Sequence, residues 1–296
     1  MHTDCQITLP ADFRSNDFLR YHLRDDAGGS EASTADGLRK GLAWHGRPAL
    51  LDIALSDRRL DARMRVDGGP APSQAELRAM LVRMTGLDQD IAGFEAAVAA
   101  HPSLGPLVKA QSGLRVAVTA TPFEALAWAV LGQQISVKAA TAIRRRFVQA
   151  AGLHHPDGLY CHPDAAIVAA MSQETMQAAG LSRTKAQTLE LISHAVVDGR
   201  LPLDAWLDAP PIPDMQDQLL ALRGIGPWTA SYTLLRGYGW LDGSLHGDVA
   251  VRNALGTLLG QEKAASTAQT QAWLADFTPW RALAAAHLWA SRALQA

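Results

Sequence analysis

The sequence predicts a mainly helical α+β protein, in which a small N-terminal domain with a sheet is followed by a larger, all-helical part. Two segments, Ala49–Leu55 and Leu60–Val66, alternate apolar and polar residues with the period of a half-buried strand. From about residue 90 the chain is rich in Ala and Leu, is broken by Pro and Gly, and has no strand-like alternation. The sheet is therefore expected in the first third of the chain only.

The composition is that of an ordinary globular protein. A chain of 296 residues with 48% hydrophobic and 19% charged residues is long enough for two or three packed units. Its apolar runs are shorter than the roughly 20 residues of a membrane span, and the segment MHTDCQITLP lacks a signal pattern. We therefore expect a cytoplasmic monomer without membrane contact. A net charge of −2 implies that any nucleic-acid binding depends on local patches and backbone donors.

The N-terminal elements follow from local patterns. After an extended ITLPADF segment, Asp17–Leu23 has the pattern of a short amphipathic helix, and Leu38–Trp44 adds a further candidate strand. Ser73 and Glu76 form a capping-box pattern that predicts the start of a helix. The apolar face of this helix is expected at Leu77, Met80, Leu81 and Met84.

The rest of the chain is predicted to be helical. The expected helices are Ile91–Ala100, Pro122–Ala151, Asp164–Ala170, Gln173–Ala179, Ser182–Asp198, Met215–Leu222, Trp228–Tyr238, Val249–Leu259, Gln269–Phe277 and Trp280–Leu294.

A Gly-Ile-Gly turn separates two of these helices. Gly224 and Gly226 permit positive φ angles and carry no side chains, so the free amides at the start of the next helix can face outward. Such a group of amides, with a helix dipole behind it, suits a phosphate. Taken alone, the same pattern is more often a plain packing corner between helices.

An aromatic set and one acid accompany this turn. Trp228 and Tyr232 are four residues apart and share a helix face, and Trp289 lies on the predicted C-terminal helix. Any one of these aromatic residues is more often part of a core than of a binding site. Asp248 precedes a helical run and has the ordinary role of an N-cap, worth about 1 kcal/mol. A catalytic role is compatible with that position.

Five motifs occur in order along the helical part of the chain. The pattern LxGIGxWTAxY is followed after about twenty residues by Gly-Asp before a helix. The four other segments are FEALAWAVLGQQISV from Phe123, GLSRTKA from Gly180, GRLP from Gly199 and WRALA from Trp280. Together these motifs resemble those of the helix–hairpin–helix DNA glycosylases, and in particular the bacterial 3-methyladenine DNA glycosylase II family. The resemblance runs collinearly from about residue 90 to residue 296.

The resemblance implies three domains. Residues 1–97 would form a TATA-binding-protein-like α+β domain, residues 98–122 with 240–296 a helical domain, and residues 123–239 a second helical domain that carries the hairpin. It also implies that the amides of Gly224, Gly226 and Thr229 grip a DNA phosphate. A structural monovalent cation would be bound there by carbonyls near Leu220, Leu222 and Ile225, and no other cofactor and no side-chain metal site is expected.

The family's catalytic aspartate corresponds to Asp248, and its base pocket corresponds to Trp228, Tyr232 and Trp289. A glycosylase rotates the damaged nucleotide out of the duplex before it cuts the base–sugar bond. A carboxylate can then stabilise the oxocarbenium-like sugar and orient the attacking water. Alkylated purines such as 3-methyladenine are cationic, and aromatic faces attract a cation by about 0.5–2 kcal/mol.

Further positions follow from the same resemblance. Gln133 and Gln134 correspond to the turn that fills the gap in the duplex, where a similar family member has leucine at the position of Gln134. Two aromatic pocket positions are replaced here by Val249 and Ala290, which implies a roomier pocket. Arg252, one turn beyond Asp248, is a candidate DNA contact. The basic run Arg144–Arg146 is interpreted as a solvated helix face.

The lyase-type relatives have a lysine where this chain has Trp228, and some carry an iron–sulfur cluster that two cysteines cannot bind. The sequence therefore predicts a monofunctional hydrolase that removes alkylated purines from double-stranded DNA in base excision repair and leaves an abasic site. Two alternatives remain: a glycosylase for a deaminated or oxidised base, and a non-catalytic DNA-binding protein that keeps the hairpin for grip.

Overall fold

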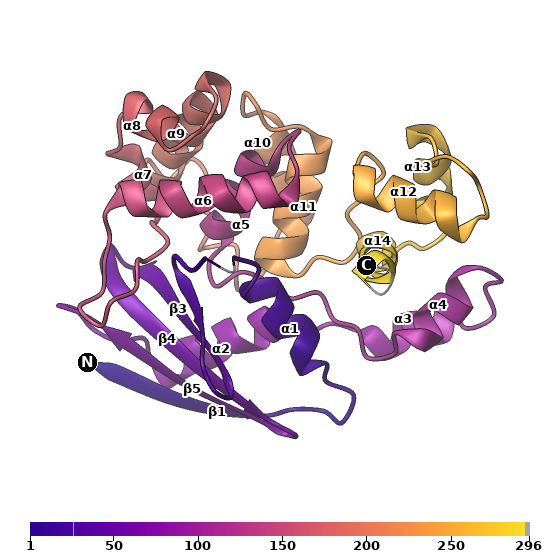
Figure 1. The fold of residues 1–296 in the computed structure, drawn as a ribbon, viewed down its shortest axis with the longest axis horizontal. Helices are drawn as coiled ribbons and strands as arrows, with labels where there is room; N and C mark the ends of the chain where they lie inside the picture. Colours follow the sequence, from indigo (N-terminus) through magenta and orange to yellow (C-terminus); the bar gives the residue numbers. More distant parts are fainter. Residues whose placement is uncertain (26, 294–296) are drawn as a thin grey trace.

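The computed structural model describes residues 1–25 and 27–293 of the chain. In Figure 1 the N-terminal sheet lies on one side with helices α5 to α9 above it, and helices α12 to α14 lie beyond α10 and α11. The predicted fold class, an α+β domain followed by an all-helical core, is confirmed. Within the described part of the chain no helix is long and apolar enough to cross a membrane.

The sheet is antiparallel throughout and has the strand order β1-β5-β4-β3-β2. The three predicted strands are confirmed as β3, β4 and β5, whereas β2 is too short to show a pattern. Apolar residues of one face are covered by α1 and α2, and Ser73 makes the predicted capping box with Glu76. The elements of this domain are β1 (His2–Thr8), α1 (Ser15–His22), β2 (Glu31–Ser33), β3 (Gly37–Trp44), β4 (Arg47–Ser56), β5 (Arg59–Val66) and α2 (Gln74–Thr85).

The remaining elements are helices that enclose two further apolar cores. One core joins α3, α4 and parts of α5 and α11 to the C-terminal helices, and the other lies among α5 to α11. The helices are α3 (Ile91–Val98), α4 (Leu104–Ala110), α5 (Pro122–Gly132), α6 (Val137–Ala151), α7 (Ala165–Ala169), α8 (Gln173–Ala178), α9 (Arg183–Val197), α10 (Ile212–Leu220), α11 (Pro227–Tyr238), α12 (Val249–Leu258), α13 (Thr267–Ala275) and α14 (Arg281–Ala293).

The prediction of one helix over Pro122–Ala151 is wrong, and the turn that the family resemblance implies at Gln133 and Gln134 is present. Helix α5 ends at Gly132, Gln134 adopts a left-handed φ of 57°, and α6 begins anew after Ser136. The Ser136 hydroxyl accepts a hydrogen bond from the amide of Ala139 at 3.2 Å, as a helix N-cap does. The helix is therefore interrupted at Gln133–Ser136. The predicted end of the C-terminal helix, Leu294, lies outside the described residues.

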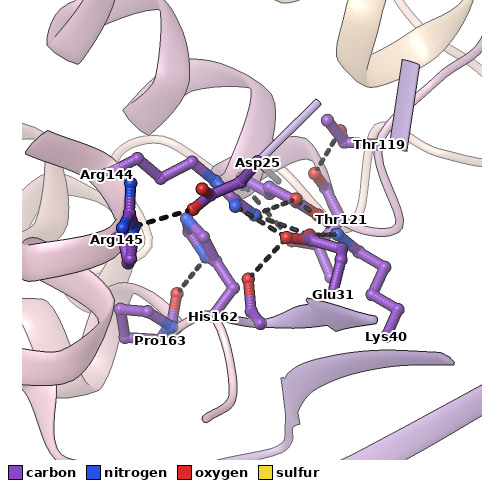
Figure 2. A network of polar contacts seen from close by, with 11 residues as sticks. Asp25, Glu31, Lys40, Thr119, Thr121, Arg144, Arg145, His162 and Pro163 are labelled. Atoms are coloured by element: carbon purple, nitrogen blue, oxygen red, sulfur yellow. Dashed lines mark hydrogen bonds and ion pairs between the residues drawn. The ribbon is translucent and has the colours of Figure 1, made fainter. Parts of the chain in front are cut away.

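A buried ion cluster joins the sheet to α5 and α6 (Figure 2). The Lys40 ammonium group donates to Glu31 at 2.5 Å and to Glu124 at 2.6 Å. The Arg144 guanidinium group donates to both oxygens of Glu31 at 2.8 Å and to Glu124 at 3.0 Å. Two bases and two acids thus neutralise one another where the N-terminal and helical domains meet.

The interpretation of Arg144–Arg146 as a solvated helix face is wrong for Arg144, whereas Arg145 is partly exposed and Arg146 is exposed. Arg144 is buried in the ion cluster, and Arg145 pairs with Asp25 at 3.2 Å. The Nε of Arg146 donates to the carbonyl of Ala179 at 2.8 Å. All three guanidinium groups serve contacts within the protein, which a run of like charges in a sequence does not reveal.

Buried histidines predict acid sensitivity. Burial lowers the pKa of His22 to about 3, that of His162 to about 4 and that of His287 to about 3, so all three are neutral in the folded chain at pH 7. In the unfolded chain they bind protons below about pH 6.5. The free energy of unfolding therefore has its full value above that pH. It falls as the pH drops below it, by about 2 kcal/mol per histidine between pH 7 and pH 5.

Urea unfolding at pH 7, 6 and 5 measures this loss. A free energy of unfolding that stays constant over these values would contradict the prediction. The His22→Gln variant provides the control, because its loss of stability on acidification should be smaller than that of the wild type.

Glu124 adds a second loss of stability at lower pH. Burial alone would raise the pKa of Glu124, but Lys40 and Arg144 outweigh burial and lower it to about 2. That loss begins below about pH 4.5.

Candidate active site

Asp248 is the N-cap of α12, as its position before a helical run predicts. Its Oδ1 accepts hydrogen bonds from the amides of Ala250 at 2.8 Å and Val251 at 3.0 Å. These bonds satisfy two of the amides that a helix leaves free at its N-terminus. They also hold the carboxylate in a single orientation, with the positive end of the helix dipole beside its charge.

Two indoles complete the surroundings of this carboxylate. Trp228 of α11 donates from Nε1 to Oδ2 at 2.9 Å, and Trp289 of α14 donates from Nε1 to Oδ1 at 3.2 Å. Residues of α11, α12 and α14 thus converge on one acid. Among the described residues Oδ2 accepts only the Trp228 bond, so a lone pair of this oxygen can face a sugar or a water molecule.

The aromatic residues predicted to form the pocket lie together. The ring centroids of Trp228 and Tyr232 are 5.1 Å apart, and those of Tyr232 and Trp289 are 6.3 Å apart. Tyr232 is buried, whereas both indoles remain partly exposed. A planar base between two rings needs a spacing of about 7 Å, twice the carbon–carbon contact distance. The rings must therefore rotate or separate slightly to admit a base between Tyr232 and Trp289.

The predicted hairpin is formed by α10, a turn over residues 221–226, and α11. Gly224 has a φ of 92°, and a Cβ on it would lie 2.1 Å from the Thr188 hydroxyl oxygen, so only glycine fits. Gly226 is the N-cap of α11 with extended backbone, and a Cβ there would meet no atom within 4 Å. Of the two glycines, Gly226 therefore faces open space, and Gly224 supports the turn.

Three amides at this turn make no backbone hydrogen bond in the described part of the chain, although Thr229 is buried. Pro227 occupies the first position of α11, and Gly226 makes no side-chain cap. Within the described part of the chain, the amides of Gly224, Gly226 and Thr229 have no hydrogen-bond acceptor. Free amides at a helix N-terminus form a binding site for an anion such as a phosphate. The structure thus provides the donors that the sequence pattern predicts.

The two glycines allow a matched experiment. We expect Gly226→Ala to leave the free energy of unfolding within about 0.5 kcal/mol of the wild type but to weaken binding to abasic duplex DNA about tenfold, because a methyl group would separate a phosphate from the amides. Gly224→Ala should instead lower the free energy of unfolding by about 1–3 kcal/mol. Urea unfolding and fluorescence anisotropy measure the two effects, and unchanged DNA affinity of Gly226→Ala would contradict the predicted grip.

The turn after α5 is hydrogen-bonded to the hairpin. The Gln133 amide nitrogen donates to the Gly224 carbonyl at 2.9 Å and to the Thr229 hydroxyl at 3.0 Å. Lys185 donates to the Leu131 carbonyl at 2.8 Å, which caps the C-terminus of α5. Gln134 is exposed beside these contacts with its left-handed backbone. Gln133 is therefore a link between the turn and the hairpin, and Gln134 remains the candidate for insertion into DNA.

The other predicted positions are less clearly placed for DNA. Arg252 is partly exposed, and its Nε donates to the Ala265 carbonyl at 2.9 Å. Val249 is 65% exposed, and Ala290 packs beside the core that contains the aromatic set. The Leu222 carbonyl already accepts a hydrogen bond from the amide of Ile225 at 3.1 Å. No cluster of metal-binding side chains occurs in the part of the chain that the structure describes.

Sequence reasoning did not predict that Arg24 of the N-terminal domain contacts Trp128 of α5. Arg24, just after α1, lies over the ring of Trp128 with its guanidinium carbon 3.9 Å from the ring centroid. It also lies 4.5 Å from the ring centroid of Tyr21. Neither Arg24 nor Tyr21 belongs to a motif, so no signal in the sequence could have placed them near Trp128.

Comparison with known proteins agrees with this geometry. The profile of the HhH-GPD superfamily of base excision DNA repair proteins matches residues 127–279, which include the turn, the hairpin and Asp248. The chain belongs to this superfamily. The predicted resemblance to helix–hairpin–helix glycosylases is thereby confirmed.

Curated relatives of this HhH-GPD chain include repair enzymes. It is 32% identical over 210 residues to the probable bifunctional transcriptional activator/DNA repair enzyme AlkA of Mycobacterium tuberculosis, a match that covers 70% of this chain and 41% of that protein. It is 29% identical over 189 residues to DNA-3-methyladenine glycosylase 2 of Escherichia coli, which covers 63% of this chain and 64% of the relative. The chain therefore spans less than two thirds of either relative.

Solved structures support the assignment of the HhH-GPD fold. The 3-methyladenine DNA glycosylase of Archaeoglobus fulgidus superimposes with a TM-score of 0.78 at 19% identity and covers 96% of both chains. An 8-oxoguanine glycosylase/lyase of Clostridium acetobutylicum gives a TM-score of 0.72 at 14% identity, over 97% of this chain and 94% of that one. Likeness at such low identity establishes a shared fold and does not distinguish between these substrates.

Proposed function

We propose that the chain is a cytoplasmic, monofunctional DNA glycosylase. It hydrolyses the N-glycosidic bond of a flipped-out alkylated purine in double-stranded DNA. The observation that carries this proposal is the Asp248 carboxylate, held by the indoles of Trp228 and Trp289 beside the ring of Tyr232. A protein that only grips DNA needs no such arrangement. The names of the 3-methyladenine glycosylase relatives support the choice of an alkylated purine.

In this proposal each part of the site has a separate role. The hairpin amides hold a backbone phosphate, and Gln134 fills the space that the flipped nucleotide leaves. The base enters beside the aromatic rings, with Oδ2 of Asp248 directed at the sugar. When the bond breaks, the sugar gains positive charge, and a fixed carboxylate stabilises this charge. Asp248 also orients the water molecule that adds to the sugar carbon.

A monovalent cation at the hairpin is part of the proposal. Carbonyl oxygens of the turn would bind it and so support the amides that face the phosphate. Potassium titration at constant ionic strength tests this, because affinity for abasic DNA should then depend on potassium separately from total salt. Equal affinity in sodium, potassium and tetramethylammonium salts would contradict it.

The absence of lyase activity gives a separate prediction. A lyase needs an amine that forms a Schiff base with the sugar, and this chain has Trp228 at the position where the lyase-type relatives have lysine. We expect borohydride to trap no covalent complex with DNA that contains the damaged base. A trapped adduct on a denaturing gel would contradict the monofunctional assignment.

Release of free base from methylated duplex DNA tests the main proposal. The wild type should release 3-methyladenine and 7-methylguanine and leave alkali-labile abasic sites. Binding to abasic DNA without any base release would favour the non-catalytic alternative. Release from duplexes with 8-oxoguanine or uracil, with none from methylated DNA, would favour the alternative of an oxidised or deaminated base.

A further inference from the structure

The hairpin turn carries a basic residue that has no ion-pair partner within the protein. Arg223 precedes Gly224 in the turn between α10 and α11 and is exposed. Within the described part of the chain its guanidinium group takes part in no hydrogen bond and no salt bridge. The guanidinium groups of Arg144 and Arg145, by contrast, are matched by carboxylates of the protein. Arg223 is therefore free to bind an anion from outside the chain.

A polar groove of about 460 Å³ lies beside Arg223. Besides this arginine, its walls include side chains of α8 and α9, namely Gln173, Thr184, Gln187, Glu190 and His194. Thr184, Gln187 and His194 are exposed and share one face of α9, because their spacing is close to whole helical turns. From the first to the last of them the helix rises about 15 Å, which is roughly four base-pair steps of a duplex. The groove is therefore long enough for a segment of DNA backbone.

The groove begins where the hairpin packs against α9. The Thr188 hydroxyl, which lines the groove, lies directly behind Gly224 of the turn. Lys185, in the first turn of α9, donates to the Leu131 carbonyl, and Gln133 donates to the Gly224 carbonyl. The start of α9, the turn after α5 and the hairpin therefore form one continuous surface. The groove is thus adjacent to the proposed phosphate grip of the hairpin.

The side chains of the groove suit phosphate oxygens. The planar guanidinium group of Arg223 keeps its charge and can donate two parallel hydrogen bonds to a phosphate. The hydroxyl of Thr184 and the amide of Gln187 are neutral donors of the kind that contact DNA backbones. Glu190 also lines the groove, but its Oε2 accepts a hydrogen bond from the Gln173 amide at 2.6 Å, so this oxygen is directed at α8.

Two further basic residues at the start of neighbouring helices lack partners. Lys138 lies in the first turn of α6, and Arg183 is the first residue of α9. Both are exposed, and among the described residues neither side chain forms a hydrogen bond or a salt bridge. With Arg223 they give this surface a local positive charge, on which DNA binding by a chain of net charge −2 depends. An acidic peptide would match the charge as well, but the groove continues the proposed DNA grip.

We propose that the groove formed by α8, α9 and Arg223 is a second backbone site, which binds phosphates of the duplex next to the phosphate held by the hairpin. The proposal rests on the DNA binding that the proposed function requires, and it extends that binding beyond the hairpin. Contacts of this kind carry no sequence information. They add affinity and salt dependence, and they fix the position of the duplex while a nucleotide is rotated out.

Replacing single phosphates of the DNA tests this assignment. An abasic duplex is prepared as a series in which one phosphate near the lesion at a time becomes an uncharged methylphosphonate, and fluorescence anisotropy gives the affinity for each duplex. We expect two groups of sensitive positions, each with a loss of affinity of about three- to tenfold. Gly226→Ala should abolish the sensitivity of one group only, and Arg223→Met that of the other.

The unmodified abasic duplex provides a second measurement. Arg223→Met should weaken binding about tenfold and lower the slope of log affinity against log salt by about 1, because one phosphate contact is lost. Glu190→Gln removes the negative charge of the groove and should strengthen binding about twofold. Arg58, in the turn between β4 and β5, is exposed and forms no salt bridge in the described chain. Arg58→Met therefore removes the same charge and should leave the affinity within about twofold of the wild type.

Arg223 and Arg58 are both exposed, so urea unfolding of the two variants should match that of the wild type. A wild type with a single group of sensitive phosphates would overturn the groove site, and so would an Arg223→Met variant that keeps both groups. Equal affinities of Arg223→Met and Arg58→Met would also overturn it. If the wild type shows both groups but releases no damaged base, the groove site stands and the proposed glycosylase function fails.

Discussion

Replacing Asp248 by asparagine is expected to lower the rate of base release about a thousandfold or more, while affinity for abasic DNA changes little. The substitution removes the negative charge that stabilises the oxocarbenium-like sugar. It also exchanges one acceptor oxygen for a donor NH₂ group, although both oxygens of Asp248 accept hydrogen bonds from N–H groups. Single-turnover release of 7-methylguanine measures the effect.

Matched variants separate the charge from its surroundings. Glu262→Gln removes an exposed acid after α12 and should behave as the wild type does. Trp289→Phe removes one N–H donor but keeps a ring and the carboxylate, so its rate should fall less than that of Asp248→Asn. A wild-type rate for Asp248→Asn would show that the carboxylate takes no part in the reaction.

Replacing Lys40 by methionine is expected to lower the free energy of unfolding by about 3–5 kcal/mol, because Glu31 and Glu124 would then share a single buried cation. Burial alone would raise the pKa of Glu31, but Arg144 and Lys40 together lower it well below its ordinary value. Without Lys40, one of the two acids must be buried without full compensation. Urea unfolding followed by tryptophan fluorescence measures the loss.

Arg39 on the same strand provides the control. Its ion pair with Asp52 at 2.6 Å is partly exposed, with 36% of the Arg39 side chain accessible. Arg39→Met should therefore cost no more than about 1 kcal/mol. Equal losses for Arg39→Met and Lys40→Met would show that burial of the cluster adds nothing to its contribution.

Much of the fold could be predicted from local patterns. Alternation identified β3, β4 and β5, and the capping box of Ser73 and Glu76 marked the start of α2. The position of Asp248 before an apolar helical run identified an N-cap. The sequence patterns failed where neighbouring helices merge in composition, as they do across Gln133–Ser136. Helix α5 ends at Gly132, and the left-handed residue of the turn that follows is Gln134 rather than the glycine or asparagine that usually marks such a position.

The sequence by itself determined the residue types of the candidate site: the glycines of the hairpin, the aromatic residues and Asp248. The hairpin glycines, Trp228, Tyr232 and Asp248 lie in one short stretch of the sequence, and the family resemblance adds Trp289 to them. Only the tertiary structure decided that both indoles donate to Asp248 and that Gln133 joins the turn to the hairpin. It also placed Arg24 over the ring of Trp128 and buried Arg144 between domains. These contacts join residues that are far apart in the chain, and they depend on how domains pack, which no local pattern records.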